Sequence, residues 1–398
     1  MIKKDYIRHL LTYGSGKIVS SLVIFLLLPL FTFKFAPAEY AIYSIISIFI
    51  TFMNLIYLMG IQESLFSYFY KEDSSSYHFT LMTSVYITLF FSSTIFSFLI
   101  YFLRFQLSEI LFSTKDYAHY FSLIAVILWF NSFFAITQNF LNIIEKSSSY
   151  VKNSLTNVFV MIVLFGYGYI TDQFNIENIL NWLITISIIS SLSSAFYMNE
   201  ILKKLNGNKY FSIKIIKSCI SFGLPMIPGS ISLLILSLSD RYLLSKLSPN
   251  GLYDTGIYAV SYKIGLIVSF VVSLFSLVYL PYAMRISQDK NARKVYQKFF
   301  NLYLILGSLI SIFVILFSPE IFHIFLNKTY YKGIRYVFFG AVSNFLVGVF
   351  YLINIAFYNL KRSKTIALVI ISGALLNILL NIISIPRYGI IGAGFSSI

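Results

Sequence analysis

Four charged side chains stand inside or at the ends of long apolar runs of this 398-residue sequence, and they are the best leads to a functional site. A charge placed in hydrocarbon is costly, so such a residue usually faces a cavity. Lys263 lies several residues into its run, where it either faces a cavity or reaches an interface or a local partner through its long stem. Lys17 lies nearer the end of its run. Asp240 and Arg241 are adjacent, and form either an ordinary pair at a helix end or a gate and proton site.

The run that carries Asp240 begins with two prolines three residues apart, Pro225 and Pro228, which are flanked by glycines. Proline cannot donate a backbone hydrogen bond, and it frees a carbonyl one turn earlier in a helix. In lipid that carbonyl must find another partner, so a span that accepts this cost more often lines a cavity than faces lipid. We expect helix kinks at both prolines, and also at Pro29 in the first apolar run.

The residue patterns of bond-making chemistry are absent from the sequence. The segment Gly14-Ser-Gly16-Lys17 resembles the end of a phosphate-binding loop, but that pattern needs a glycine where the chain has Leu11. The four histidines are not spaced as metal ligands, and the sequence has no paired carboxylates or nucleophile elbow. We therefore expect a protein that is not an enzyme, without a metal site or cofactor, although a proton or sodium ion could be coupled to its activity.

Composition indicates a membrane protein with many spans. Hydrophobic residues make up 58% of the chain and charged residues 11%, and the mean hydropathy is +0.79. Soluble domains have roughly 45–50% apolar and about 25% charged residues. The formal net charge of +15 comes mostly from short loops between apolar runs, which is typical of topology control and contact with anionic headgroups rather than of nucleic-acid binding.

A helix needs about 20 apolar residues to cross a bilayer, and twelve such spans can be assigned. The twelfth begins at Tyr388 and reaches the end of the sequence at Ile398, so we expect it to be cut short. The other eleven are predicted near residues 16–35, 41–60, 79–103, 117–144, 152–171, 178–198, 218–239, 256–282, 299–317, 335–358 and 364–385.

The longest basic connector, residues 199–217, divides six spans from six. It predicts an N-terminal lobe over 1–198 and a C-terminal lobe over 218–398, which is incomplete at its end. With the N-terminus in the cytoplasm, 20 of the 30 Lys and Arg residues fall on the cytoplasmic side, as the positive-inside rule requires. The protein is therefore predicted to be multi-pass with a cytoplasmic N-terminus.

A weak internal repeat accompanies this division. Pro37 and Tyr43 follow the first span, and Pro249 and Tyr258 follow the seventh. Each half would then begin with a helix, a short outer turn that contains proline, and a second helix that contains tyrosine. Repeats of this kind place a substrate site at the interface between the halves.

Polar amides also occur along the predicted spans. They either join helices by hydrogen bonds or bind sugar hydroxyls in a hydrated cavity, and the sequence leaves both open. These residues are Asn131, Gln138, Asn139, Asn142, Asn344, Asn354, Asn377 and Asn381.

Several segments together resemble the polysaccharide-unit flippases of the Wzx type, which share a superfamily with the MATE drug exporters and the lipid II flippases. The stretch from Gly223 to Pro228, followed by Asp240-Arg241, resembles the seventh-helix signature of these flippases. Residues 13–43 resemble their first helix and outer turn, 256–281 their eighth helix and 386–394 their twelfth. The order and spacing of these segments carry the resemblance along nearly the whole chain.

The resemblance implies two six-helix lobes around a central cationic cavity that opens alternately to each side of a bacterial cytoplasmic (inner) membrane. It implies transport of undecaprenyl-pyrophosphate-linked oligosaccharide from the cytoplasmic to the outer leaflet for O-antigen, lipopolysaccharide or capsule assembly. The polysaccharide polymerase and chain-length machinery are then possible partners. Lys17, Lys263 and Arg241 become candidate cations for the diphosphate, and Asp240 a candidate for ion coupling or for holding Arg241.

Three other functions stay open on the sequence. An ion-coupled multidrug exporter of the same superfamily would want a buried, unpaired carboxylate, and none is found in the first six spans. Lipid II flippases usually carry extra C-terminal helices, and this chain stops too early to show them. A membrane scaffold of a glycan assembly complex would tolerate substitution of every charge within the spans while still needing its cytoplasmic loops.

Overall fold

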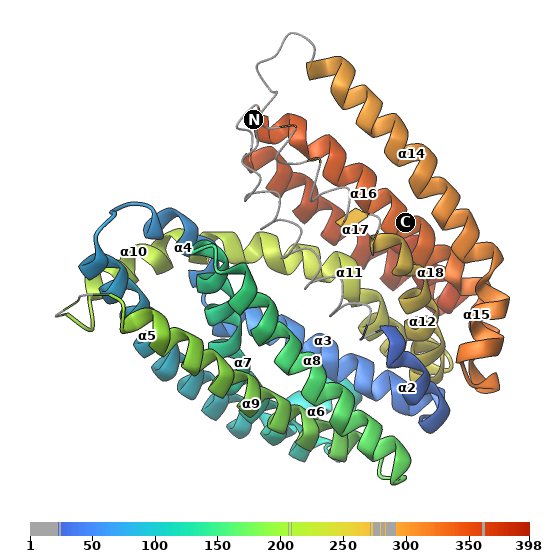
Figure 1. Cartoon of the computed structure of the whole chain (residues 1–398). Coiled ribbons are helices and arrows are strands. Elements are labelled where there is room, and N and C mark those ends of the chain that lie inside the picture. Colours follow the sequence, from blue (N-terminus) through green and yellow to red (C-terminus); the bar gives the residue numbers. More distant parts are fainter. Residues whose placement is uncertain are drawn as a thin grey trace. The chain divides into compact units, whose positions relative to one another are not determined.

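The protein is built from helices (Figure 1). The computed structural model describes residues 23, 25–205, 207, 209–270, 272–273, 279, 283, 292–359 and 363–398. Over these residues no strand is formed. The predicted all-helical, polytopic fold is confirmed.

Nine segments in the described part are long and apolar enough to cross a membrane, and each coincides with one predicted span. The three remaining predicted spans contain α2 (Leu28–Lys34), α12 (Gly251–Gly265) and α18 (Ile390–Ser397). The nine segments are Pro37–Tyr57, Ser75–Phe102, Ala118–Ile143, Ser147–Ile170, Ile176–Leu202, Ile213–Leu247, Ala292–Leu316, Lys328–Asn354 and Thr365–Tyr388.

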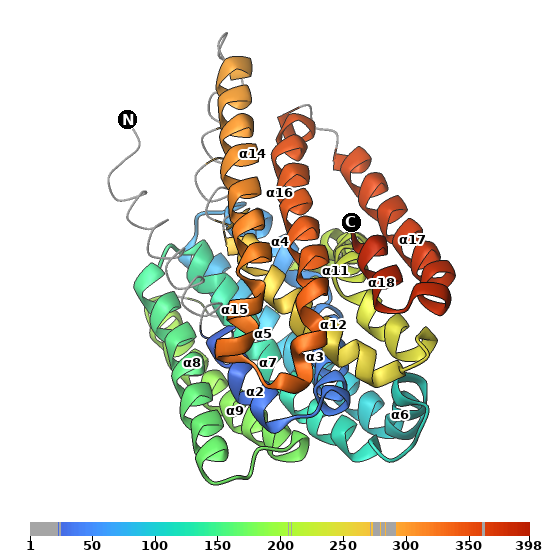
Figure 2. The same ribbon diagram turned by 90° about the vertical axis from the view of Figure 1, so that its right-hand side faces the viewer.

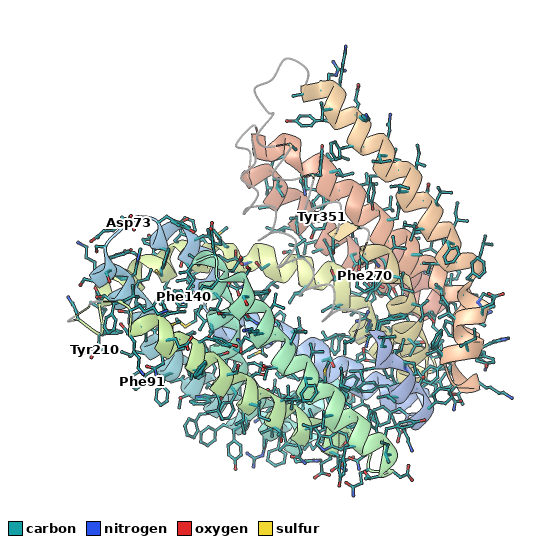
Figure 3. All side chains as sticks on the ribbon, viewed as in Figure 1. Asp73, Phe91, Phe140, Tyr210, Phe270 and Tyr351 are labelled. Atoms are coloured by element: carbon teal, nitrogen blue, oxygen red, sulfur yellow. The ribbon has the colours of Figure 1, made fainter. Side chains whose placement is uncertain are left out.

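The outward faces of these helices are apolar. Phe91 on α5 (Ser75–Phe102) is 62% exposed, whereas Phe140 on α7 (Ala118–Ile143) is fully buried (Figure 3). A soluble protein rarely exposes large contiguous apolar patches, so exposed aromatic and aliphatic side chains along many long helices indicate contact with lipid. The chain is a multi-pass membrane protein.

The chain forms two compact units. The first comprises Met1–Val23 and Ile46–Ile231, and the second comprises Ile24–Ile45 and Ser232–Ile398. The chain therefore passes from one unit to the other within α3 (Pro37–Tyr57) and within α11 (Ile227–Leu247). The predicted lobes over 1–198 and 218–398, with their linker over 199–217, stay a prediction.

In the first unit, α7 packs against each of the other long helices and against two short ones. Local sequence sets where several of these helices begin: the Ser74 hydroxyl accepts from the Tyr77 amide at the start of α5, and Asn175 accepts from the Asn178 amide at the start of α9. The helices around α7 are α4 (Ile61–Phe69), α5, α6 (Arg104–Phe112), α8 (Ser147–Ile170) and α9 (Ile176–Leu202).

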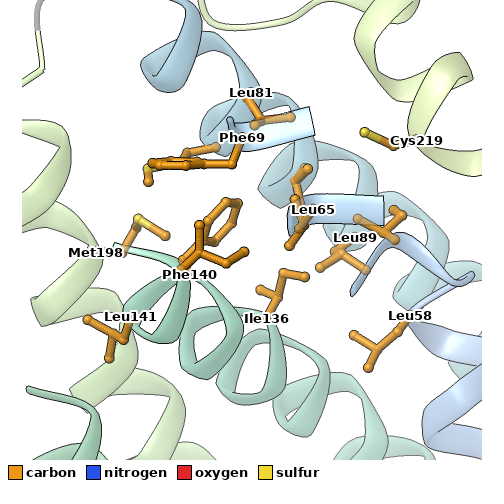
Figure 4. Close-up of a cluster of buried hydrophobic side chains, with 14 of the residues drawn as sticks. Leu58, Leu65, Phe69, Leu81, Leu89, Ile136, Phe140, Leu141, Met198 and Cys219 are labelled. Atoms are coloured by element: carbon orange, nitrogen blue, oxygen red, sulfur yellow. The ribbon is translucent and has the colours of Figure 1, made fainter. Parts of the chain in front are cut away.

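One apolar core lies at an end of this unit, where α4, α5, α7, α9 and α10 (Ile213–Gly223) meet (Figure 4). Leu65, Phe140 and Cys219 from three of these helices are buried in it. The close approach of α4 and α10 depends on two glycines, because a side-chain carbon added to Gly60 or Gly223 would overlap the backbone of the other. Gly60 also adopts a φ of 68°, which other residues rarely accept.

A polar seam joins α7, α8 and α9. Asn153 and Asn157 on α8 donate to Ser194 and Ser190 on α9, over 3.0 and 2.9 Å. Gln138 on α7 donates to Ser154 on α8 over 2.7 Å. For Gln138, the structure therefore favours a role in joining helices, which was one of the two roles left open by the sequence.

The second unit contains α2, the start of α3, most of α11, and the helices that follow. The helix α12 packs along α16, and α16 also contacts α14 and α17, so that these last three helices lie side by side (Figure 2). The elements after α12 are α14 (Ala292–Leu316), α15 (Ser318–Phe325), η2 (Lys328–Tyr336), α16 (Val337–Asn359), α17 (Ser363–Tyr388) and α18.

The turn before α3 is fixed inside this second unit. Pro37 begins α3, and the Glu39 carboxylate accepts a hydrogen bond from the Ala36 amide over 2.9 Å. Tyr330 in η2 donates to the Phe35 carbonyl over 2.9 Å. Gly256 in α12 lies so close to the Pro37 carbonyl that any side chain there would collide with it. These contacts hold the N-terminal part of α3 beside α12, where Lys263 is located.

Candidate functional site

Asp240 is a buried carboxylate, 2% exposed, that is held by neutral donors. Its Oδ1 accepts from Asn381 over 2.8 Å and from Asn377 over 3.3 Å. Its Oδ2 accepts from Ser397 over 2.5 Å and from Tyr258 over 3.3 Å. We call these five residues the Asp240 cluster, and all of them belong to the second unit.

Four helices bring the Asp240 cluster together. Asn377 and Asn381 are four residues apart on α17, so they lie on the same face of that helix. The chain reverses at Gly389, whose φ of 54° favours glycine, and α18 then returns along α17 to place Ser397 beside Asp240. Tyr258 of α12 bonds to both Asp240 and Ser397, and thereby closes the ring of contacts.

The Asp240 carboxylate has no ion-pair partner among the described residues. Four hydrogen bonds stabilise a carboxylate, but taking one charge out of water costs several kcal/mol. The carbonyl oxygen of Asn381 is also buried, and no described residue donates to it. Carboxylate, amide and hydroxyl oxygens are the ligands that hard cations prefer, so a proton or a small cation at this position would relieve both costs.

We call Arg241 of α11 and Lys263 of α12 the cation pair. Arg241 leaves α11 in a different direction from Asp240. Adjacent helix residues point about 100° apart, so Arg241 lies over Tyr262 of α12, whereas Asp240 points toward α17, α18 and Tyr258 of α12. The Arg241 guanidinium lies over the ring of Tyr262, 5.3 Å from Cζ to the ring centroid. The Lys263 ammonium donates to the hydroxyl of Tyr40 on α3 over 3.4 Å.

The ring that Arg241 covers belongs to Tyr262, which directly precedes Lys263 on α12, so the two cations are neighbours. Both side chains are half-buried, and within the described ranges neither forms an ion pair with a carboxylate. Their partners Tyr262 and Tyr40 are neutral hydroxyl-bearing rings. Two neighbouring positive charges without an ion-pair partner among the described residues form a site at which a phosphate or another anion would be stabilised.

The structure places the other predicted residues as follows. Pro225 lies in the single turn η1 (Leu224–Met226) that separates α10 from α11, and Pro228 lies in the first turn of α11. Pro29 lies in the first turn of α2. That helix begins at Leu28, directly after a turn residue at Leu27. Lys17 lies outside the described residues.

Four members of the Asp240 cluster were not predicted as site residues. Tyr258 was noted only for the internal repeat, and Asn377 and Asn381 only as two of several amides in the spans. Their four-residue spacing shows that they share a helix face, but the sequence carries no signal that this face meets Asp240. Ser397 gave no signal, because serine is common in membrane helices as a local hydrogen-bonding residue.

Comparisons with known proteins agree with this architecture. An inward-facing multidrug resistance MATE family transporter of the MOP superfamily matches with a TM-score of 0.75 and 13% identity, over 95% of this chain and 90% of that chain. The lipid II flippase MurJ, in an inward closed conformation, matches with a TM-score of 0.73 and 18% identity, over 97% of this chain and 84% of that chain. At these identities the likeness shows the fold.

Sequence comparison identifies the family. A family model described as polysaccharide biosynthesis protein matches residues 35–335, which is more than half of the chain. No curated protein matches the chain. The matched range contains the cation pair, Asp240 and Tyr258. The chain therefore belongs to the family of polysaccharide biosynthesis proteins, as the resemblance of its helical segments predicted, and it shares its fold with a MATE transporter and with MurJ.

Proposed function

We propose that this protein is a flippase that moves undecaprenyl-pyrophosphate-linked oligosaccharide repeat units from the cytoplasmic to the outer leaflet, for assembly of O-antigen or capsule. It acts by alternating access in a bacterial cytoplasmic (inner) membrane, with a cytoplasmic N-terminus. A polysaccharide polymerase and its chain-length machinery then use the delivered units.

The observation that carries the proposal is the cation pair. A diphosphate must leave the headgroup region to cross the bilayer, and fixed positive charges replace part of its hydration while the lipid tail stays in the membrane. Arg241 and Lys263 provide two such charges without a competing carboxylate among the described residues. The planar guanidinium group of Arg241 can also donate two parallel hydrogen bonds to phosphate oxygens.

The Asp240 cluster is the proposed site of ion coupling. A buried carboxylate that gains a proton or a sodium ion changes its charge, and it lies one residue before Arg241 on α11. Ion binding would therefore alter the field at the cation pair and the contacts among α11, α17 and α18. Differential ion binding of this kind can shift a two-state transporter between its conformations.

A multidrug exporter is the main alternative, and the charges of the site count against it. Cationic drugs would be repelled by Arg241 and Lys263. In the described part of residues 46–231 of the first unit, every Asp and Glu side chain is exposed. These residues therefore offer no buried carboxylate to exchange for a proton. A scaffold function is disfavoured by the cation pair itself, because a scaffold has no need of unneutralised charges within its spans.

The test is a gene deletion complemented by single variants. The deletion strain is expected to lose surface polysaccharide and to accumulate pyrophosphate-linked units in the cytoplasmic leaflet, as measured by their protection from a membrane-impermeant reagent in spheroplasts. The wild-type gene should restore surface polysaccharide and remove the accumulated units, whereas Lys263→Ala should do neither. Lys328→Ala is the matched control, because Lys328 is an exposed lysine of the same unit outside the cation pair.

Two results would contradict the proposal. Normal surface polymer together with raised sensitivity to cationic drugs would indicate an exporter. Full restoration by both Lys263→Ala and Arg241→Ala would remove the cation pair from the function and favour a scaffold. Immunoblots of the membrane fraction must show equal amounts of each variant.

A further inference from the structure

A second charged site lies away from the cation pair, at the end of the second unit where three chain reversals meet. It is a pocket of about 390 Å³. The turn before α12, the helix η2 and the turn between α17 and α18 line it. The predicted orientation places all three of these connections on the outer side of the membrane, opposite the basic loops.

Three cations line the pocket: Lys332 and Arg335 from η2, and Arg387 from the end of α17. A 3₁₀ helix has three residues per turn, so Lys332 and Arg335 lie on the same face of η2. Aromatic rings support two of them, because the Lys332 ammonium lies 5.7 Å from the ring centroid of Tyr253 and the Arg335 guanidinium lies 4.8 Å from that of Tyr336.

These three cations are not neutralised by protein carboxylates. In the described part of the chain, none of them forms an ion pair. The one acidic residue in the lining, Asp254, is buried and accepts hydrogen bonds from the neutral side chains of Ser248 and Asn250. With three cations and one carboxylate in its lining, the pocket has a formal net charge of about +2.

We propose that this pocket binds a phosphate group on the outer face of the protein. The Arg335 and Arg387 guanidinium groups bind phosphate oxygens with paired N–H donors, and Lys332 contributes a point charge. The net charge fits a dianionic or diphosphate group, and the volume is large enough to hold one. The site would hold the phosphorylated end of a ligand while the remainder lies outside the pocket.

Two sources on the outer side offer this chemistry: the headgroup of an anionic phospholipid, and the diphosphate of a lipid-linked oligosaccharide. The second source rests on the proposed function, whereas the first does not. The pocket does not contain the cation pair, because Lys332, Arg335 and Arg387 lie on η2 and α17, whereas Arg241 and Lys263 lie on α11 and α12. If the pocket binds neither ligand, the outcome of the flipping test is therefore unaffected.

The experiment uses the full chain purified in detergent, with two probes. Sodium pyrophosphate is titrated by calorimetry, and native mass spectrometry compares retention of phosphatidylglycerol with that of phosphatidylcholine. The double variant Arg335→Gln/Arg387→Gln is expected to weaken pyrophosphate binding or the preference for phosphatidylglycerol at least about tenfold, since removing one charge-assisted hydrogen bond weakens binding by about a factor of ten. Arg104→Gln, at a half-buried arginine of the first unit that does not line the pocket, is the control.

A variant that is expected to strengthen binding distinguishes an effect of charge from an effect of misfolding. Asp254→Asn removes the only negative charge of the pocket lining and keeps an acceptor for Ser248, so it is expected to tighten binding of the same probe. Pyrophosphate binding without a lipid preference identifies the diphosphate source, and a lipid preference alone identifies the headgroup. Absence of both in the wild type, or equal binding by wild type and double variant, would overturn the proposal.

Discussion

Asn381 donates a 2.8 Å hydrogen bond to Asp240 across 141 residues of sequence, and its own carbonyl oxygen is left buried without a donor among the described residues. The amide therefore stabilises the carboxylate on one side and presents an unsatisfied oxygen on the other. An oxygen left in this position costs about 1–3 kcal/mol. Under the proposed ion coupling, a proton or cation bound at Asp240 would offset part of this cost.

Replacing Asp240 by asparagine should uncouple transport from the ion gradient. Asp240→Asn keeps the shape of the side chain but removes the charge that a proton or sodium ion would bind. We expect the rate of flipping to fall about 5- to 150-fold, the range of typical coupling free energies, and to lose its dependence on proton or sodium gradients imposed on vesicles. Asp73→Asn, at an exposed residue between α4 and α5 (Figure 3), should behave as wild type. An ion-dependent rate in Asp240→Asn would show that coupling occurs elsewhere.

Removing the amide of Asn381 should destabilise the second unit. Asn381→Leu takes the 2.8 Å donor from a buried carboxylate, so we expect a loss of about 1–3 kcal/mol in the free energy of unfolding. The measurement is the thermal unfolding midpoint of purified protein in detergent. Asn139→Leu is the comparison. Among the described residues, the Asn139 side chain has as its hydrogen-bond partner the Ala135 carbonyl, one turn away on its own helix, so its replacement should change stability by less than about 0.5 kcal/mol. Equal midpoints for the two variants would mean that Asp240 does not need Asn381.

Replacing either of two glycines of the first unit by alanine should have opposite effects on stability. Gly60→Ala adds a carbon that overlaps the Gly223 backbone at a residue with φ of 68°, so we expect a loss of about 1–3 kcal/mol and lower expression. Gly166→Ala, in the middle of α8, meets nothing within 4 Å and should leave stability unchanged or raise it by up to about 1 kcal/mol. Thermal unfolding in detergent measures both. A stable Gly60→Ala protein would show that α4 and α10 do not approach as closely as described.

The helical spans could be predicted well from sequence because each is a local property. An apolar run of about 20 residues bounded by charges specifies a membrane helix without reference to the remainder of the chain. Thus the run near 152–171 predicted α8 (Ser147–Ile170) to within a few residues. The second span was predicted to begin near residue 41, whereas α3 begins at Pro37, which was placed in the preceding turn.

The functional cluster could be predicted only in part, because its members meet through tertiary packing. Asp240 and Lys263 attracted notice as charges in apolar runs, which is again a local property. The bond from Tyr258 to Asp240 joins α12 to α11, and the bond from Ser397 joins α18 to α11. Such pairings depend on how helices pack, and one sequence without its neighbours in space does not specify them.

Single cysteines should establish the orientation of the chain. The one native thiol, Cys219, is fully buried in the core of the first unit, so it should react slowly and can be replaced by alanine as background. Lys203→Cys, in the predicted cytoplasmic linker, should be labelled by a membrane-impermeant maleimide only after spheroplasts are lysed. Lys328→Cys, between α15 and α16, should be labelled in intact spheroplasts. Both positions are exposed in the structure, so accessibility to the reagent then depends on the side of the membrane.

The labelling result also decides how the phosphate-binding pocket is interpreted. Lys328 begins η2, the helix that carries Lys332 and Arg335, so its side of the membrane is the side of the pocket. Labelling of Lys328→Cys in intact spheroplasts and of Lys203→Cys only after lysis would place the pocket where a flipped diphosphate or an outer-leaflet headgroup arrives. The reverse pattern would contradict the positive-inside assignment and would turn the pocket toward the cytoplasm. There its cations would meet lipid-linked units before transport, so the same residues would act at loading rather than at release.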